Sequence, residues 1–344
     1  MELKKIFPNP CEYVKNSCKK IISKLENVKI NREKIIEFTK EIIDGKKQLK
    51  STNWSESHFS PEEVEFENFL RYIFIIDTLN FCFWPNPPFE YNNLAKNLYE
   101  TLKKNPNFFE LDNLINVTSK DLIDNIFKIN DFNLIEERTR MIKEVFYIIK
   151  NDFGSCFNFI KNSNKNAIKL IKMINDNFYC FRDQAIYKGE QIFFYKRAQI
   201  LVSDLHLAYK DLIKKIGKNE ENEILNFDIN TLKEITMFAD YRVPQILREL
   251  NILEYSNELS NLVDNKIQIL HSSVFEIEIR AATIQSIEEI KFEFQKNNLF
   301  FLSLEIDVFL WEEGEKVKDT IKPHHRTLSI FYLICLYMFK IIFF

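Results

Sequence analysis

The fold class is decided by the stretch Ala198-Gln-Ile-Leu-Val-Ser-Asp-Leu-His-Leu-Ala-Tyr-Lys-Asp-Leu212. Small and aliphatic residues recur in it at alternating intervals of three and four positions, at Ala198, Leu201, Leu205, Ala208 and Leu212. This spacing places all five side chains on one face of an α-helix, the pattern of a helix packed against a core. Most of the remaining sequence is amphipathic in the same way, so we expect a mainly helical, all-α fold.

Helix boundaries are indicated at three further places. Ser60-Pro-Glu-Glu63 combines a capping serine, a proline suited to the first helical position and a capping-box glutamate. It predicts a helix that ends near Thr78. Thr231-Leu-Lys-Glu234 predicts a second helix that ends near Asp240, and Pro244 suits the first turn of the helix after it.

Strand signals are few. The best one lies at 185–195, where Lys188-Gly189 predicts the turn of one short β-hairpin. Residues 215–226 are polar and charged and indicate an inserted loop rather than a linker between domains.

The chain shows no internal repeat, and we expect an N-terminal helical segment at 1–50, one domain at 51–332 and an apolar tail at 333–344. Lys340 is the only charge in the apolar stretch 328–344, whose 17 residues are at the lower limit of membrane-spanning length. The length and the lysine favour a buried C-terminal extension over a membrane span.

Composition excludes several classes of protein. Hydrophobic residues make up 46% and charged residues 28% of the 344, as in a soluble globular protein. Five glycines leave little room for phosphate-binding loops, and neither GxGxxG nor GxxxxGK[ST] occurs, which argues against Rossmann and P-loop enzymes. The net charge of −3 lacks the basic bias of a protein that follows a nucleic-acid backbone, but is compatible with a nucleotide-sized partner.

Cysteine and histidine spacing indicates neither disulfides nor a metal site. The six cysteines form no CxxC pair and the N-terminus has no signal-peptide pattern, so we expect reduced thiols in a cytoplasmic protein. The five histidines form no HExxH motif and no cluster with cysteine, so we predict that no metal is bound.

Seven segments resemble, in order, the signatures of the queuosine salvage protein family. They are Asp77-Thr-Leu-Asn-Phe-Cys-Phe-Trp84, Glu136-Glu-Arg138, Phe181-Arg-Asp183, Tyr195-Lys-Arg-Ala-Gln199, Met237-Phe-Ala-Asp-Tyr-Arg-Val-Pro-Gln245, Glu276-Ile-Glu-Ile-Arg280 and Pro323-His-His-Arg326. The resemblance covers residues 50–332. The sequence departs from the family in having Glu90-Tyr91-Asn92 in place of Gly-Tyr-Trp, a longer loop at 215–226 and the apolar tail.

The resemblance implies an all-α fold similar to helical DNA glycosylases. It also implies hydrolysis of queuosine 5′-phosphate to queuine and ribose 5-phosphate, without metal or cofactor, for the salvage of queuine into tRNA. The partner is then a small nucleotide, with no direct contact to nucleic acid. The alternative is a helical module that binds a queuosine nucleotide or tRNA without chemistry.

The chemistry of this reaction points to a carboxylate under the sugar. Breaking a ribosyl C–N bond passes through an oxocarbenium-like centre, which a fixed negative charge stabilises. Queuine is a 7-deazaguanine, so protonation at N7 is not available to help the base leave. Asp240 is our candidate, because it lies between two predicted helices where the backbone can direct its side chain into a cleft. Its structural alternative is to cap the next helix.

Lys196 is the second catalytic candidate. It opens the helix of the Ala198 stretch but lies off the apolar face. A cation gains nothing from the dipole at a helix N-terminus, so binding the 5′-phosphate or pairing with Asp240 would explain it. A solvated surface lysine is the alternative.

The base requires acidic and aromatic partners. Its guanine-like edge and its ammonium side arm each suit a carboxylate, for which Asp183 and Asp307 are candidates. We expect His58 to bond the cyclopentene diol, and Phe238 or Trp84 to stack on the base. The alternatives are structural, with the aromatic residues in the core, the histidine at the start of a helix and the acids paired with arginine.

Glu276, Glu278 and Arg280 alternate along a predicted helix and cannot all share one face. We therefore expect at least one of them to form a structural ion pair.

Overall fold

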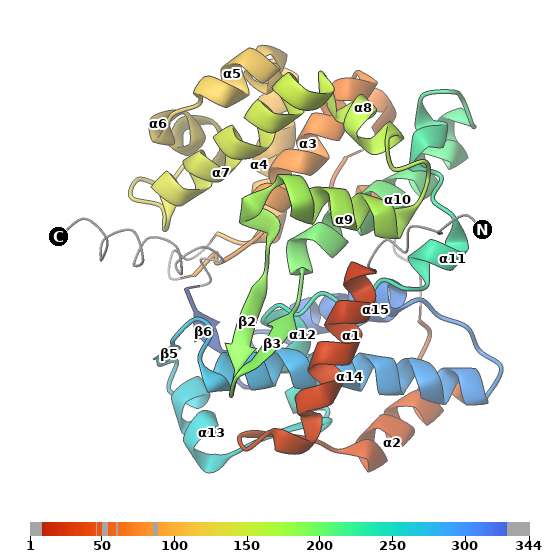
Figure 1. Ribbon diagram of the computed structural model, residues 1–344. Coiled ribbons are helices and arrows are strands. Elements are labelled where there is room, and N and C mark those ends of the chain that lie inside the picture. The colour runs from red at the N-terminus through yellow and green to blue at the C-terminus, as the bar shows by residue number, and fades with distance from the viewer. Residues whose placement is uncertain (1–8, 46, 50–53, 60, 85–88, 329–344) are drawn as a thin grey trace, which may run out of the picture. The chain divides into compact units, whose positions relative to one another are not determined.

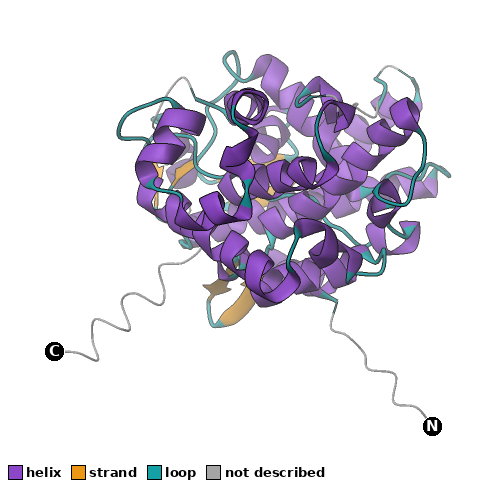
Figure 2. Cartoon of the chain, turned by 90° about the horizontal axis from the view of Figure 1, so that it is seen from above, coloured by secondary structure: helices purple, strands orange, loops and turns teal. Residues whose placement is uncertain are grey.

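The computed structural model describes residues 9–45, 47–49, 54–59, 61–84 and 89–328. Its internal contacts divide the chain into two compact units. Unit 1 comprises Met1–Thr52, Asp183–Lys196 and Ile229–Ser329, and unit 2 comprises Asn53–Arg182, Arg197–Asp228 and Ile330–Phe344. Both units are predominantly helical, and the few short strands of the described residues all lie in unit 1, which confirms the predicted all-α class (Figures 1 and 2).

Unit 1 collects segments that are far apart in the sequence. Its elements are α1 (Pro10–Ile21), β1 (Val28–Ile30), α2 (Arg32–Ile43), β2 (Gln184–Tyr187), β3 (Glu190–Phe193), α11 (Ile229–Leu232), α12 (Arg242–Glu249), β4 (Leu253–Tyr255), α13 (Asn257–Asp264), β5 (Gln268–Ile269), α14 (Val274–Lys296), α15 (Ser303–Val317) and β6 (Arg326–Thr327).

The central element of unit 1 is α14. Its buried residues include Ile277, Ile279, Ala282, Ile284 and Ile287, which lie on all sides of the helix rather than along one stripe. A helix that is apolar all round is covered all round, and α1, α2, β1, α12 and α15 each pack against α14. Figure 1 shows α1 crossing α14.

The strands of unit 1 form three two-stranded sheets. The pairs β1–β4 and β2–β3 are antiparallel and β5–β6 is parallel. The β2–β3 hairpin confirms the strand prediction, and its turn uses Lys188 at φ 47° and Gly189 at φ 82°. Two successive positive φ angles are what a two-residue hairpin turn requires, and glycine adopts one of them without steric cost.

The described residues of unit 2 contain helices and connecting segments but no strand. Its elements are α3 (Phe66–Leu79), α4 (Tyr91–Lys104), α5 (Leu111–Asn116), α6 (Ser119–Leu122), α7 (Ile135–Ile148), α8 (Cys156–Lys161), α9 (Ala167–Asn177) and α10 (Lys196–Ile216), the last of which begins with the final residue of a unit 1 segment. Every residue of α3 from Phe69 to Leu79 is buried, and α4, α7 and α8 pack against it.

Two of the predicted helical features are confirmed. The five residues of the Ala198 face are all buried in α10, and Pro244 lies in the first turn of α12. The residues 215–226 include the end of α10 and a 3₁₀ turn at Asn222–Leu225.

Two predicted helices differ in extent. The residues Pro61–Glu63 form only a 3₁₀ turn, and α3 begins at Phe66 after Glu65, whose carboxylate accepts the N–H groups of Glu67 and Asn68. Ser60 lies outside the described residues. The prediction of a helix from Thr231 to Asp240 is wrong, because α11 is a single turn that ends at Leu232.

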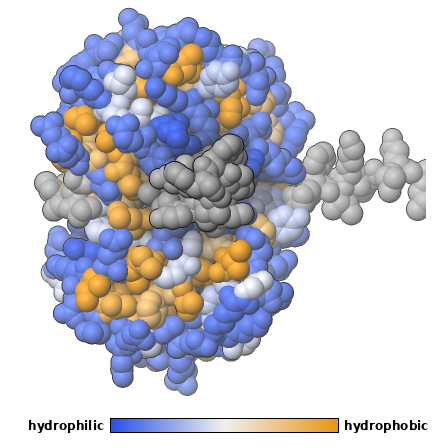
Figure 3. Space-filling view, turned by 60° about the vertical axis from the view of Figure 1, so that its left-hand side comes forward, coloured by the Kyte–Doolittle hydropathy of each residue, from blue (hydrophilic) through white to orange (hydrophobic). Residues whose placement is uncertain are grey.

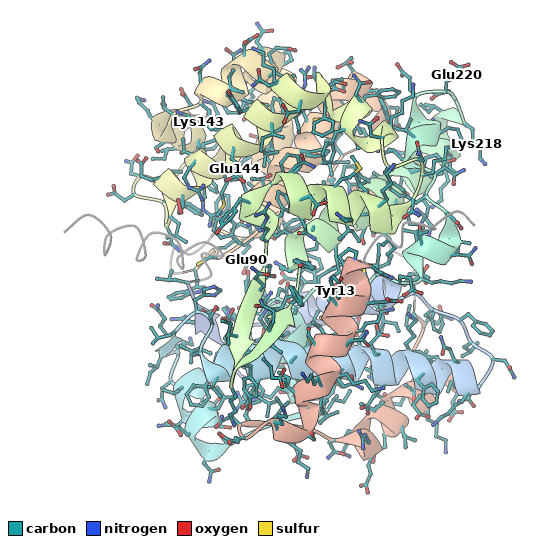
Figure 4. The ribbon with its side chains drawn as sticks, in the orientation of Figure 1. Tyr13, Glu90, Lys143, Glu144, Lys218 and Glu220 are labelled. Atoms are coloured by element: carbon teal, nitrogen blue, oxygen red, sulfur yellow. The ribbon has the colours of Figure 1, made fainter. Side chains whose placement is uncertain are left out.

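The departure at Glu90-Tyr91-Asn92 begins a helix. The Glu90 backbone N–H donates to Oδ1 of Asn93 at 2.8 Å, which closes the first turn of α4 (Figure 4). Of the described residues, none belongs to a helix long and apolar enough to cross a membrane. The predicted tail at 333–344 lies outside the described residues. The five described cysteines form no disulfide with one another.

A buried arginine organises the end of α3. Arg138 on α7 is fully buried and its guanidinium donates to the carbonyls of Leu79, Phe81 and Cys82 at 2.7–2.8 Å. Its Nε donates to the carbonyl of Asn133 at 3.0 Å. One side chain thus binds four carbonyls, that of Leu79 at the end of α3 and those of three residues in irregular segments, where backbone carbonyls lack the regular partners of a helix or sheet.

A second buried arginine acts on the same region. Arg197 on α10 donates to the carbonyl of Thr78 at 2.5 Å and to that of Cys180. The N–H of Cys180 donates to Oε1 of Glu144 on α7 at 2.9 Å (Figure 4). Both the N–H and the carbonyl of Cys180 are therefore hydrogen-bonded, which fixes the segment that leads to Asp183.

We predict that Arg138→Met strongly destabilises the protein. Each buried carbonyl left without a donor costs about 1–3 kcal/mol, so we expect a loss of at least about 3 kcal/mol in the free energy of unfolding, measured by urea denaturation. Arg140→Met on the same helix is the control, because Arg140 makes surface ion pairs with Glu137 and Glu144, worth at most about 1 kcal/mol. Equal losses would contradict the assigned role of Arg138.

Candidate functional site

The candidate site in unit 1 is built on the loop before α12. The N–H of Asp240 donates to the carbonyl of Phe238 at 2.7 Å, an i to i+2 contact that turns the chain sharply. Oδ1 of Asp240 accepts the N–H groups of Arg242 and Val243 at 2.9 and 3.3 Å. Among the described residues, no hydrogen bond reaches Oδ2. Asp240 therefore caps α12 with one oxygen and keeps the other for a further partner.

Asp307 on α15 supports this loop from the side. It is buried, and its Oδ1 accepts the N–H of Phe238 at 3.0 Å. Burial, and then the charge of Asp240, raise the pKa of Asp307 well above its usual range, while the Phe238 hydrogen bond and Lys196 act in the opposite direction. Asp240 and Lys196 thus both lie close enough to Asp307 to affect its pKa.

Lys196 is buried at the first position of α10 and is not the solvated surface lysine of the alternative interpretation. The residue before it, Tyr195, has φ 49°. A bulky residue in this left-handed region costs of order 1–2 kcal/mol. The strained turn directs the chain from β3 into the helix at Lys196.

Asp183 has protein partners for both oxygens. Oδ1 and Oδ2 accept from the guanidinium of Arg280 at 2.9 and 2.5 Å, and Oδ2 also accepts the N–H of Lys196 at 3.1 Å. Arg280 forms the expected structural ion pair, with Asp183 and also, at 3.7 Å, with Glu276 on its own helix. Arg182, the residue before Asp183, donates to the carbonyls of Asn175 and Asp176.

Phe238 is 7% exposed, so its ring is largely inside unit 1. Its backbone makes the contacts to Asp240 and Asp307 described above. Stacking of this ring on a base remains a prediction, and packing in the core explains its present burial.

His58 and Trp84 belong to unit 2. The His58 ring stacks on Trp54 with centroids 3.9 Å apart and 6° between the planes. Its Nδ1 lies 2.9 Å from the hydroxyl of Tyr72 and its Nε2 lies 3.3 Å from that of Tyr91. Burial lowers the pKa of His58 to about 3, so the ring is neutral. Both nitrogens already have hydroxyl partners, and a contact to a diol would have to share or replace one of them.

Tyr91 connects His58 to an acid that the sequence analysis missed. Its hydroxyl donates to Oδ2 of Asp204 on α10 at 3.3 Å. Burial raises the pKa of Asp204 to about 7, against the lowering effect of the Tyr91 hydrogen bond. The sequence did contain an indication that this acid is buried. Asp204 lies three positions after Leu201 and one before Leu205, and both leucines are on the apolar face of α10.

Trp84 is partly buried at the end of the segment that Arg138 organises. Its carbonyl accepts from Nδ2 of Asn133 at 2.8 Å. Stacking of its ring on a base remains a prediction. The described residues contain no group of three or more His, Cys, Asp or Glu side chains arranged to hold a metal ion.

The fold and site define a predominantly helical protein in which one loop carries Asp240 and is bound by the buried Asp307, whose pKa the buried Lys196 affects. A family model described as queuosine salvage protein matches residues 58–332. The chain belongs to this family, and the resemblance seen in the sequence is confirmed.

Three relatives named queuosine 5′-phosphate N-glycosylase/hydrolase show how far the similarity extends. One from Dictyostelium discoideum is 40% identical, covering 94% of this chain and 100% of the relative. One from Sphaerobacter thermophilus is 30% identical, covering 93% and 97% respectively. One from Mus musculus is 31% identical, covering 81% and 86%.

We predict a pH dependence of stability from Asp204. An unfolded aspartate ionises near pH 4, whereas folded Asp204 keeps its proton to about pH 7. Between these values the folded state binds more protons, so this residue lowers stability as pH rises, by up to about 1.4 kcal/mol per unit. Asp204→Asn should remove that slope in urea unfolding measured from pH 4 to 8.

Tyr91→Phe removes the hydrogen bond that lowers the pKa of Asp204. The fall in stability with rising pH should therefore continue to a higher pH in this variant than in the parent. Tyr147→Phe, at an exposed position on α7, is the control and should leave the profile unchanged. Parallel profiles for the parent and Asp204→Asn would contradict the prediction.

Proposed function

We propose that this protein hydrolyses the N-glycosidic bond of queuosine 5′-phosphate and releases queuine and ribose 5-phosphate. The observation that carries the proposal is the arrangement of Asp240, Asp307 and Lys196 around the loop before α12. The names of the relatives supply the substrate, and the motif residues of the family fall on this loop. We further propose that the protein acts in the cytoplasm on the free nucleotide.

Asp240 is proposed to stabilise the sugar as the bond breaks. The electron pair of the C1′–N bond leaves with the base, water adds its oxygen to C1′, and its two hydrogens end on the new hydroxyl and on the base. Positive charge develops on the ribose in between, and a fixed carboxylate offsets it. Oδ2 suits this role because Oδ1 is engaged at the N-terminus of α12, which fixes the carboxylate before substrate arrives.

Lys196 is proposed to bind the 5′-phosphate or to pair with Asp240. It is 6% exposed, so a charge on its ammonium group needs a partner close by. Its lowering effect on the pKa of Asp307 supports a position near that carboxylate. A phosphate bound there would hold the ribose in place while the base departs.

Asp307 is proposed to contact the base. Its Oδ1 is engaged by Phe238, and Oδ2 is the oxygen left for a ligand. A cationic side arm or the N–H groups of the base would favour the ionised carboxylate. His58 as a partner of the diol, with Phe238 or Trp84 stacking on the base, completes the set of proposed binding residues.

Asp240→Asn is the decisive variant. The amide oxygen can still accept the N–H groups at the start of α12, so stability should change little. The lost charge should lower turnover by about 10²–10³-fold or more. Purified protein is incubated with queuosine 5′-phosphate, and free queuine is measured by mass spectrometry.

Asp121→Asn is the matched control, because Asp121 also accepts a backbone N–H, from Thr118 at the start of α6. It should retain parental turnover. If Asp240→Asn still hydrolyses within about tenfold of the parent, Asp240 is only a cap and the mechanism is wrong. A parent that binds the nucleotide without releasing queuine would favour the binding-module alternative.

The enzyme should prefer the 5′-phosphate to the free nucleoside, because phosphate contacts position the sugar. Lys196→Ala should reduce this ratio of kcat/KM values. Lys291→Ala is the control, since Lys291 is partly buried in unit 1 and donates to the carbonyl of Lys233 and the hydroxyl of Ser303. Equal kcat/KM for nucleoside and nucleotide in the parent would show that the phosphate is not recognised.

A further inference from the structure

Arg280 contacts both segments that carry the proposed catalytic residues. Its Nε donates to the carbonyl of Ala239 at 3.0 Å, and its two terminal nitrogens donate to Asp183 at 2.9 and 2.5 Å. Arg280 is 4% exposed and its guanidinium lies 3.9 Å from the centroid of the Phe194 ring. The planar group is therefore fixed by an aromatic face and three acceptors, which leaves it one orientation.

The contact to Ala239 determines the orientation of Asp240. The carbonyl of Ala239 and the N–H of Asp240 belong to one planar peptide group. Arg280 holds the oxygen of this group, and the carbonyl of Phe238 holds its N–H at 2.7 Å. With both ends of the plane held, the N–Cα bond of Asp240 is oriented, and the contacts of Oδ1 to the start of α12 then hold the side chain.

The contact to Asp183 determines the start of α10. Oδ2 of Asp183 accepts the N–H of Lys196, and its carbonyl accepts those of Phe194 and Tyr195 at 2.9 and 3.1 Å. Three successive N–H groups thus converge on one residue. This convergence holds Tyr195 in its left-handed conformation and places the Lys196 backbone.

We propose that Arg280 and Asp183 form a brace that positions Asp240 and Lys196 relative to each other. In this proposal, which rests on the proposed function, both are positioning residues and neither contacts the substrate. Asp183 thereby takes a role different from the base recognition that the sequence suggested, because its oxygens already serve Arg280 and Lys196. Glu276, with Oε1 3.7 Å from Arg280, adds a second negative charge beside the guanidinium.

Lysine cannot replace arginine in such a brace. One ammonium group retains the charge but cannot bind two carboxylate oxygens and a carbonyl in the same plane. Arg280→Lys should therefore lower kcat by about 10²-fold, the effect of a displacement near 1 Å, and leave KM for queuosine 5′-phosphate almost unchanged. Asp183→Asn should have a similar effect. The double variant should lose little more than either single variant, because the two residues act as one unit.

Arg248 and Asp264 provide a matched control in the same unit. Arg248 is also buried, binds both oxygens of Asp264 at 2.6 and 3.1 Å and lies against the Tyr255 ring. Arg248→Lys removes the same kind of interaction without touching the Asp240 or Lys196 segments. It should lower the free energy of unfolding but keep the parental kcat.

Hydrogen–deuterium exchange tests the brace without turnover. In Arg280→Lys, amides in 193–199 and 236–243 should exchange at least about tenfold faster than in the parent, and in Arg248→Lys they should not. Release of queuine by the parent tests the proposed function alone, so the two can fail separately. Unchanged exchange in these segments, a kcat within about threefold of the parent, or an equal loss in Arg248→Lys would overturn the brace.

Discussion

A buried guanidinium must satisfy its donors inside the protein, and this constraint shapes both units. Arg138 and Arg197 bind carbonyls at the end of α3, and Arg280 binds Ala239 and Asp183. A carbonyl in an irregular segment has no ladder partner, so a planar group with five donors can replace the missing regular structure. These three arginines, each from a different family signature, therefore bind loops inside the protein and are not exposed to solvent.

The loops held in this way carry the candidate site residues. Asp240 needs a backbone that is neither helical nor mobile, because one oxygen caps α12 while the other remains without a partner among the described residues. Lys196 needs a helix that starts from a strained residue, Tyr195. Neither conformation is favourable by itself, and the hydrogen bonds of Asp183 and Arg280 offset its cost.

On the face seen in Figure 3 the exposed surface is mostly hydrophilic, with apolar areas among it.

Periodicity and turn chemistry predicted the local elements well. The Ala198 face, the Lys188-Gly189 hairpin and the place of Pro244 follow from interactions between near neighbours in the chain. The helix expected at 231–240 failed for the opposite reason. Thr231 lies inside α11 rather than before it. Phe238 and Ala239 are bound by Asp307 and Arg280, which lie 69 and 41 positions away in the chain. Such contacts leave no trace in local spacing.

By itself, the sequence determined the helical class and the family, and it marked Asp240, Asp307 and Lys196 as candidates for the site. Only the tertiary structure decided which role is open to each of those residues. It engaged both oxygens of Asp183 with Arg280 and Lys196, and it raised the pKa of Asp307 and of Asp204, a residue that no motif had marked. The physical reason is that hydrogen-bond occupancy and burial are properties of neighbours in space, and α14 brings residues from three distant parts of unit 1 into contact.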